Sequence, residues 1–101
     1  MARPVRETYL EDAAAALTRL TDRLDGLRAF IERTPSAQRF ALERALDELR
    51  ALRNRTEAKL EDVRRSSEDA WQLIKVHSDN ALAQFKGGID RVETQMHRNA
   101  A

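Results

Sequence analysis

Two histidines, His77 and His97, are the side chains of this sequence best suited to proton transfer near neutral pH. Neither belongs to a recognisable nucleophile arrangement, there is no cysteine, and no glycine-rich loop precedes a helix to cradle a phosphate. Asp90, Glu93 and His97 have a helical spacing that could hold a metal ion, but a solvated charge pair is the simpler interpretation. We therefore expect no enzyme activity, no catalytic residue, no metal site and no cofactor.

The charges argue against a nucleic-acid site. Eighteen basic residues balance seventeen acidic ones, for a net charge of +1. The dense arginines between positions 50 and 65 alternate with Glu57, Glu61 and Asp62, and no aromatic residue lies among them for base stacking. We expect a charged coiled-coil exterior here and no nucleic-acid partner.

Residues 70–96 repeat a chemical pattern every eleven positions. Eleven residues make three helical turns of about 3.67 residues, so the repeat keeps one side of a helix apolar. This side is the predicted interaction face, and its members are Trp71, Ile74, Ala81, Leu82, Phe85, Ile89, Val92 and Met96. The pattern requires a partner, which could be the rest of the chain, a second copy or a lipid surface.

The first half of the sequence predicts an antiparallel coiled-coil hairpin. A helix over 8–33 begins at a capping box formed by Thr8 and Glu11 and ends before Pro35. The next helix starts at once, with Thr34 as N-cap and Pro35 at the first helical position, so the two helices are antiparallel neighbours. The predicted hairpin seam consists of Leu10, Leu17, Leu20, Leu24, Leu27, Leu42, Leu46, Leu49, Leu52 and Leu60.

The second half allows two arrangements within a single helical domain, 1–101. No glycine or proline lies between Pro35 and Gly87, so we favour an uninterrupted helix over 35–86 that extends beyond the hairpin. Alternatively, Ser66 and Asp69 form a new capping box, the helix breaks near 66–67, and the chain makes a three-helix bundle. Gly87 and Gly88 predict a kink before a helical tail over 88–98, although Gly88 would also permit close helix approach.

The segment Ala70-Trp71-x-x-Ile74-Lys75, followed by Ala81 and Phe85-Lys86, comes after a charged antiparallel coiled coil. This arrangement resembles small bacterial coiled-coil proteins of the stress-response type, which have an eleven-residue repeat headed by Ala-Trp-x-x-Leu/Ile-Lys near the C-terminus. His77 replaces a frequent glycine of that pattern, and Gly87-Gly88 replace alanines. The resemblance implies a non-enzymatic, stress-associated helper in the bacterial cytosol.

The sequence as a whole predicts an all-α structural or interaction protein that self-assembles through its C-terminal amphipathic face. An extended hairpin would leave that face without a partner, so we expect a homo-oligomer, with a dimer favoured. A protein partner remains open, and the alternative function is binding to a lipid membrane or a storage-granule surface. The N-terminus lacks the apolar stretch of a secretion signal, so we expect a cytoplasmic location.

Overall fold

The computed structural model describes the backbone of residues 5–100 and the side chains of residues 5–98. It contains three long helices, α1 (Val5–Glu32), α2 (Ser36–Arg65) and α3 (Trp71–Ala100), and no strand within that range. The predicted all-α class is therefore confirmed. Residues 1–4, part of the segment that we interpreted as lacking a secretion signal, lie outside the described range.

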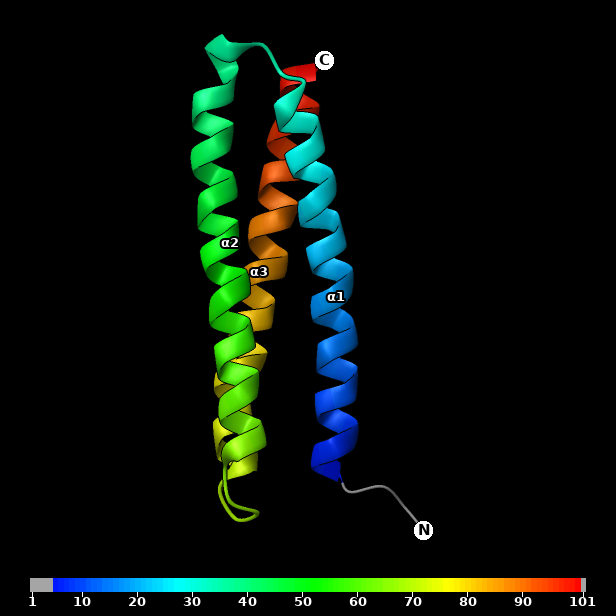
Figure 1. Cartoon of the computed structure of the whole chain (residues 1–101), viewed down its shortest axis with the longest axis vertical. Helices are drawn as coiled ribbons and strands as arrows, with labels where there is room; N and C mark the ends of the chain where they lie inside the picture. The colour runs from blue at the N-terminus through cyan, green and yellow to red at the C-terminus, as the bar shows by residue number, and fades with distance from the viewer. Residues whose placement is uncertain (1–4, 101) are drawn as a thin grey trace.

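The three helices form an elongated bundle. Figure 1 shows α1 and α2 as an antiparallel pair, with α3 lying behind and between them and running in the direction of α1. The bundle extends over 54 × 23 × 17 Å, and its radius of gyration is 16.2 Å. A compact domain of this length has a radius of gyration of about 13 Å. The protein is thus a rod about one helix pair wide, with a narrow core along its axis.

The core is made by one apolar side of each helix. Most members of the predicted seam are buried, while Leu10 and Leu52 are half-buried against the core. Phe85 and Ile89 of α3, both fully buried, join the same cluster of side chains. Burial of this apolar surface is the main force that holds the bundle together.

The start of α1 differs from the expectation. The described helix already includes Val5, so Thr8 and Glu11 lie within the helix and do not form a box at its start. The apolar periodicity that located the helix begins at Leu10, and polar residues before it can be helical without contributing to that periodicity.

The turn between α1 and α2 corrects the predicted role of Thr34. The Thr34 hydroxyl donates to the carbonyl oxygen of Phe30 at 3.1 Å, so it bonds back to the end of α1. Pro35 is the N-cap residue of α2, and no side chain caps that helix. Threonine can bond either forwards or backwards along the chain, and here the carbonyl one turn earlier is its acceptor.

The favoured prediction of an uninterrupted helix over 35–86 is wrong. The chain breaks between α2 and α3, as in the three-helix alternative. α2 ends at Arg65, and both the amide and the hydroxyl of Ser66 donate to the carbonyl oxygen of Val63, at 3.3 and 2.7 Å. Arg6 of α1 donates to the carbonyl oxygen of Ser66 at 2.6 Å and pairs with Glu68. The turn is therefore stabilised by a residue at the other end of the sequence.

The glycine pair does not interrupt α3, which is continuous from Trp71 to Ala100. A Cβ atom at Gly88 would lie only 2.7 Å from Cδ2 of Leu49 and 3.3 Å from Cδ1 of Leu52. Gly88 therefore allows α3 to approach α2 closely, as its place on the apolar face suggested. The intrinsic cost of glycine in a helix is offset by this packing.

Candidate interaction site

The predicted interaction face of α3 lies inside the bundle. Ile74 and Leu82 are half-buried. The other members are at most 8% exposed, and they are Trp71, Ala81, Phe85, Ile89, Val92 and Met96. The partner of this face is the chain's own hairpin, because the break after Arg65 brings α3 back along α1 and α2. Our inference that the face lacks a partner within the chain depended on an extended α3.

A polar cluster holds the beginning of α3 against α1. The Tyr9 hydroxyl lies 2.6 Å from the fully buried Ser78 hydroxyl and donates to Asp79 at 2.7 Å. The centres of the Tyr9 and Trp71 rings are 6.1 Å apart, and the Lys75 ammonium lies 5.0 Å from the centre of the Tyr9 ring. Burial, with the nearby Asp79 carboxylate, raises the pKa of Tyr9 to about 12. The cluster fixes the position of α3 along α1.

A second polar link lies near the other end of the same interface, at the residues that had a metal-like spacing. The guanidinium of Arg23 donates to Asp90 at 2.8 Å and also to Glu93. Hydrogen bonding to Arg23 and then to Lys86 lowers the pKa of Asp90. His97 is exposed, and no metal-binding group of His, Cys, Asp or Glu occurs among the described residues. These carboxylates join α3 to α1.

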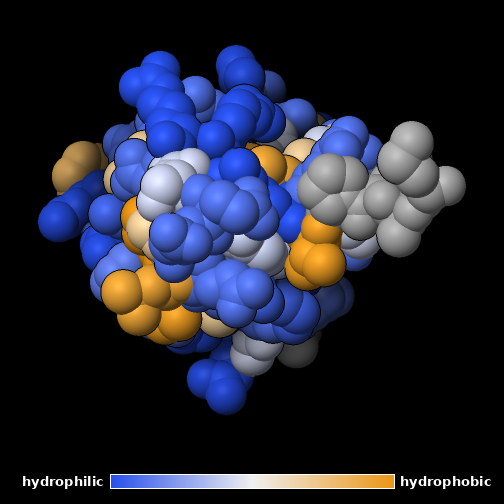
Figure 2. Space-filling view, turned by 90° about the horizontal axis from the view of Figure 1, so that it is seen from below, coloured by the Kyte–Doolittle hydropathy of each residue, from blue (hydrophilic) through white to orange (hydrophobic). Residues whose placement is uncertain are grey.

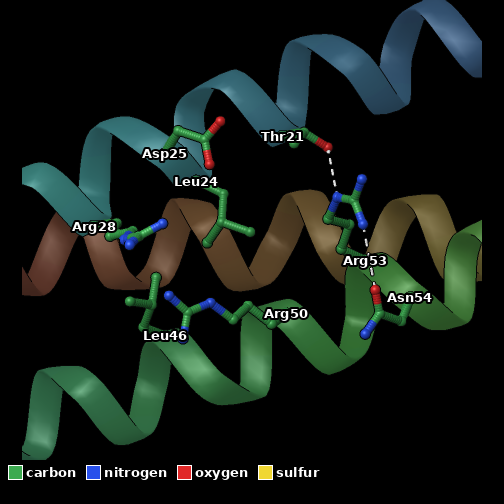
Figure 3. Close-up of a pocket in the computed structure, with 8 residues that line it drawn as sticks. All are labelled: Thr21, Leu24, Asp25, Arg28, Leu46, Arg50, Arg53 and Asn54. Atoms are coloured by element: carbon green, nitrogen blue, oxygen red, sulfur yellow. Dashed lines mark hydrogen bonds between the residues drawn. The ribbon is translucent and has the colours of Figure 1, made fainter.

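An open groove of about 410 Å³ lies between α1 and α2, and Figure 3 shows its lining. Leu24 and Leu46 point towards each other across it, while Arg53 donates to Thr21 at 3.2 Å and to Asn54 at 3.3 Å. The volume is sufficient for a small ligand. Whether the groove attracts an anion therefore depends on its arginines.

Each arginine of this groove is already paired with a carboxylate on its own helix. These pairs are Arg28–Glu32 at 3.1 Å, Arg50–Asp47 at 3.1 Å and Arg53–Glu57 at 2.9 Å. The local positive charge is neutralised by residues of the helices that form the groove. The groove consequently has the character of a charged coiled-coil surface rather than of an anion site.

A more apolar hollow lies where α1 meets α2, next to the last turns of α3. Phe30, Pro35, Leu42 and Met96 line it, and Phe30 is 41% exposed. The hydroxyl of Thr34, which also lines the hollow, is bonded to the Phe30 carbonyl oxygen. The hollow could accept an apolar side chain, and Arg33 and Gln38 are the other polar residues of its lining.

The outer side of α3 carries an exposed apolar pair. Leu73 is 77% exposed and Val76 is 52% exposed, three residues apart on one side of the helix. Asn80, Ala83 and Gly87 continue the same uncharged side at spacings of four, three and four. Figure 2 looks at the end of the bundle where α3 begins and shows hydrophobic patches among a mostly hydrophilic surface.

We call these five residues, Leu73, Val76, Asn80, Ala83 and Gly87, the outer stripe. Alternating spacings of three and four are the heptad pattern of a helix that packs against another helix. The outer stripe is the candidate interaction site.

No family model, no curated protein and no solved structure matches this chain. None of its described helices has a stretch long and apolar enough to cross a membrane. The function must therefore be argued from the surface of the bundle.

The outer stripe was not predicted, although its spacing is visible in the sequence. The eleven-residue repeat is longer and contains Trp71, Phe85 and Ile89, so it dominates the periodicity of α3. Leu73 and Val76 can be identified as exposed apolar residues only when the fold shows which side of α3 the hairpin covers. The contacts of Tyr9 with α3 had no local signal, because they join residues about seventy positions apart.

Proposed function

We propose that this protein is a non-enzymatic coiled-coil interaction protein that self-assembles, with a homodimer as its basic unit. The observation that carries the proposal is the exposure of Leu73 and Val76 on a bundle whose own core is already complete. Neighbouring exposed apolar residues on one side of a helix are typical of sites that contact another protein.

The cellular part of the proposal rests on the resemblance to small bacterial coiled-coil proteins of the stress-response type. We propose that the protein acts in the bacterial cytoplasm as a stress-associated helper. Deleting the gene should lower survival after heat or drying relative to unstressed growth, and re-expression should restore it. Equal survival of the deleted and complemented strains under every stress would contradict this role.

Self-assembly is tested by the dependence of mass on concentration. We expect sedimentation equilibrium to give about the chain mass of 11.6 kDa at low micromolar concentration and twice that mass towards the millimolar range. A short helix pair buries less than the roughly 800 Å² per partner of a standard interface, so the dimer should dissociate on dilution. A mass that stays monomeric throughout would contradict self-assembly.

The alternative, binding to a lipid membrane or a storage-granule surface, requires the bundle to open. Trp71, the only tryptophan, is 3% exposed and packs near Tyr9. In a closed bundle its emission should be blue-shifted in buffer and unchanged by anionic vesicles. A further change of emission on adding vesicles, together with co-sedimentation of the protein, would favour the lipid function and place α3 on the membrane.

A further inference from the structure

The outer stripe lies on the opposite side of α3 from the buried Phe85 and Ile89. It is uncharged over four helical turns in a protein in which 35% of residues are charged. Its spacing is that of a heptad, which suits a second helix lying nearly parallel or antiparallel to α3. The buried face follows the eleven-residue spacing instead, so α3 carries two separate packing patterns.

Charged residues beside the outer stripe indicate which helix could lie on it. Asp79 and Lys86 flank one edge of the stripe, seven residues apart, and His77 and Gln84 flank the other edge. In an antiparallel pair of α3 helices, equivalent edges face each other. Asp79 of each copy would then face Lys86 of the other, which gives two symmetrical ion pairs.

A parallel pair of α3 helices has the opposite electrostatic outcome. Opposite edges would then meet, and Lys86 would face Arg91 of the second copy. Like charges opposite each other destabilise a helix pair, whereas the antiparallel pair places unlike charges opposite each other. A second copy of this chain therefore has charges complementary to the outer stripe when the two α3 helices are antiparallel.

We propose that the outer stripe pairs antiparallel with the outer stripe of a second copy of this chain, with Asp79 facing Lys86 across a two-fold axis. The inference rests on the proposed self-assembly and names the surface that carries it. In this register Asn80 lies opposite Ala83 of the second copy, and Val76 lies opposite Gly87. A larger side chain thus meets a smaller one in each of these layers. Leu73, at the end of the stripe, lies opposite Asp90, whose carboxylate is held by Arg23 and Lys86.

The residues at the proposed interface can add these contacts to the ones they make within the chain. Asp79 is exposed and accepts from the Tyr9 hydroxyl through Oδ1, so its Oδ2 can accept from Lys86. A Cβ atom at Gly87 would lie 3.4 Å from Nη1 of Arg91, so the exposed Arg91 side chain covers Gly87 and swings aside on pairing. Lys86 pairs with Asp90 at 2.9 Å, and its side chain is 63% exposed. Its ammonium group has three donors, so it can bind a second carboxylate while keeping the first.

Charge reversal tests the pairing directly. Asp79→Lys places a lysine opposite Lys86, and Lys86→Asp places an aspartate opposite Asp79, so each variant alone repels its own copies. We expect each single variant to raise the dimer dissociation constant by about tenfold or more. Mixing the two variants restores both attractive pairs without restoring the Tyr9–Asp79 bond that Asp79→Lys removes, so the rescue reports the pairing between copies. Sedimentation equilibrium of the equimolar mixture, at a concentration where the wild type is dimeric, should then show a dimer that neither variant forms alone.

Two similarly exposed apolar residues provide a matched control for the surface itself. Leu73→Asn removes a 77% exposed side chain from α3, and Phe40→Asn removes a 71% exposed side chain from α2. We expect Leu73→Asn to weaken the dimer and Phe40→Asn to leave its dissociation constant unchanged. Circular dichroism should show the same helix content for both, because neither side chain belongs to the core.

The outcomes separate this inference from the proposed function. A wild-type protein that stays monomeric at all concentrations overturns both. A dimer that ignores charge reversal, that forms no mixed dimer, or that Leu73→Asn and Phe40→Asn weaken equally overturns the antiparallel pairing alone. In that case self-assembly stands and another surface carries it.

Discussion

The two faces of α3 both repeat at helical spacing, and the fold buries the inner one and leaves the outer one exposed. On the inner face, Phe85 and Ile89 are fully buried, whereas Leu73 on the outer face is 77% exposed. The inner face extends from Trp71 to Met96 and packs on the hairpin along its whole length, while the outer face holds only two large apolar residues. When a helix carries two periodic faces, the face with more apolar area is the one that folding buries.

The comparison is sharpest when one large side chain is removed from each face. Phe85→Ala should destabilise the monomer by about 3–5 kcal/mol, because it leaves a cavity in the core. Leu73→Ala should change stability by no more than about 0.5 kcal/mol, because that side chain is largely solvated. Urea unfolding at a concentration where the protein is monomeric measures both. Similar losses for the two variants would mean that the faces are not distinct.

The two adjacent glycines test the same difference at the level of a single methyl group. Gly87→Ala should stabilise α3 by up to about 1 kcal/mol, because alanine favours the helix and only the exposed Arg91 side chain lies nearby. Gly88→Ala forces its methyl group against Leu49, which is 2% exposed and has little room to move. We expect it to be less stable than Gly87→Ala by about 1–3 kcal/mol. Thermal melts of the two variants side by side measure the difference.

The polar contacts at the edge of the inner face should make stability depend on pH. The pKa of Tyr9 is about 12 in the folded protein, above its ordinary value of 10.0, so folding favours the neutral phenol. The stabilisation is complete below pH 10 and is lost as the pH rises from 10 to about 12. Tyr9 is the only tyrosine, so absorbance near 295 nm follows its ionisation alone. Tyr9→Phe should flatten the pH dependence, and a titration midpoint near 10 would contradict the burial of the phenol.

Local patterns were sufficient for the helices and for the side that each helix buries. The leucine seam of α1 and α2 and the eleven-residue face of α3 follow from periodicity, because a helix in water must cover its apolar side. The ends of the helices were harder. Thr34 can bond to either neighbouring helix, and the choice depends on which acceptor the turn brings closer.

The site was less accessible to prediction than the fold. Periodicity identified α3 as the helix with a face in need of a partner, but it could not say that the hairpin would be that partner. The exposed pair, Leu73 and Val76, is ordinary in the sequence and becomes informative only when the bundle leaves it in solvent.

The sequence alone determined an all-helical chain with a leucine hairpin and an amphipathic third segment. Only the tertiary structure decided that the chain turns back after Arg65, since neither glycine nor proline marks that position. Arg6 binds the Ser66 carbonyl oxygen and Tyr9 packs near Trp71, and both come from the opposite end of the sequence. The hydrogen bonds inside a helix join residues close in sequence, so local patterns predict them. Where no glycine or proline ends a helix, its end depends on tertiary contacts that satisfy the backbone groups left without helical partners.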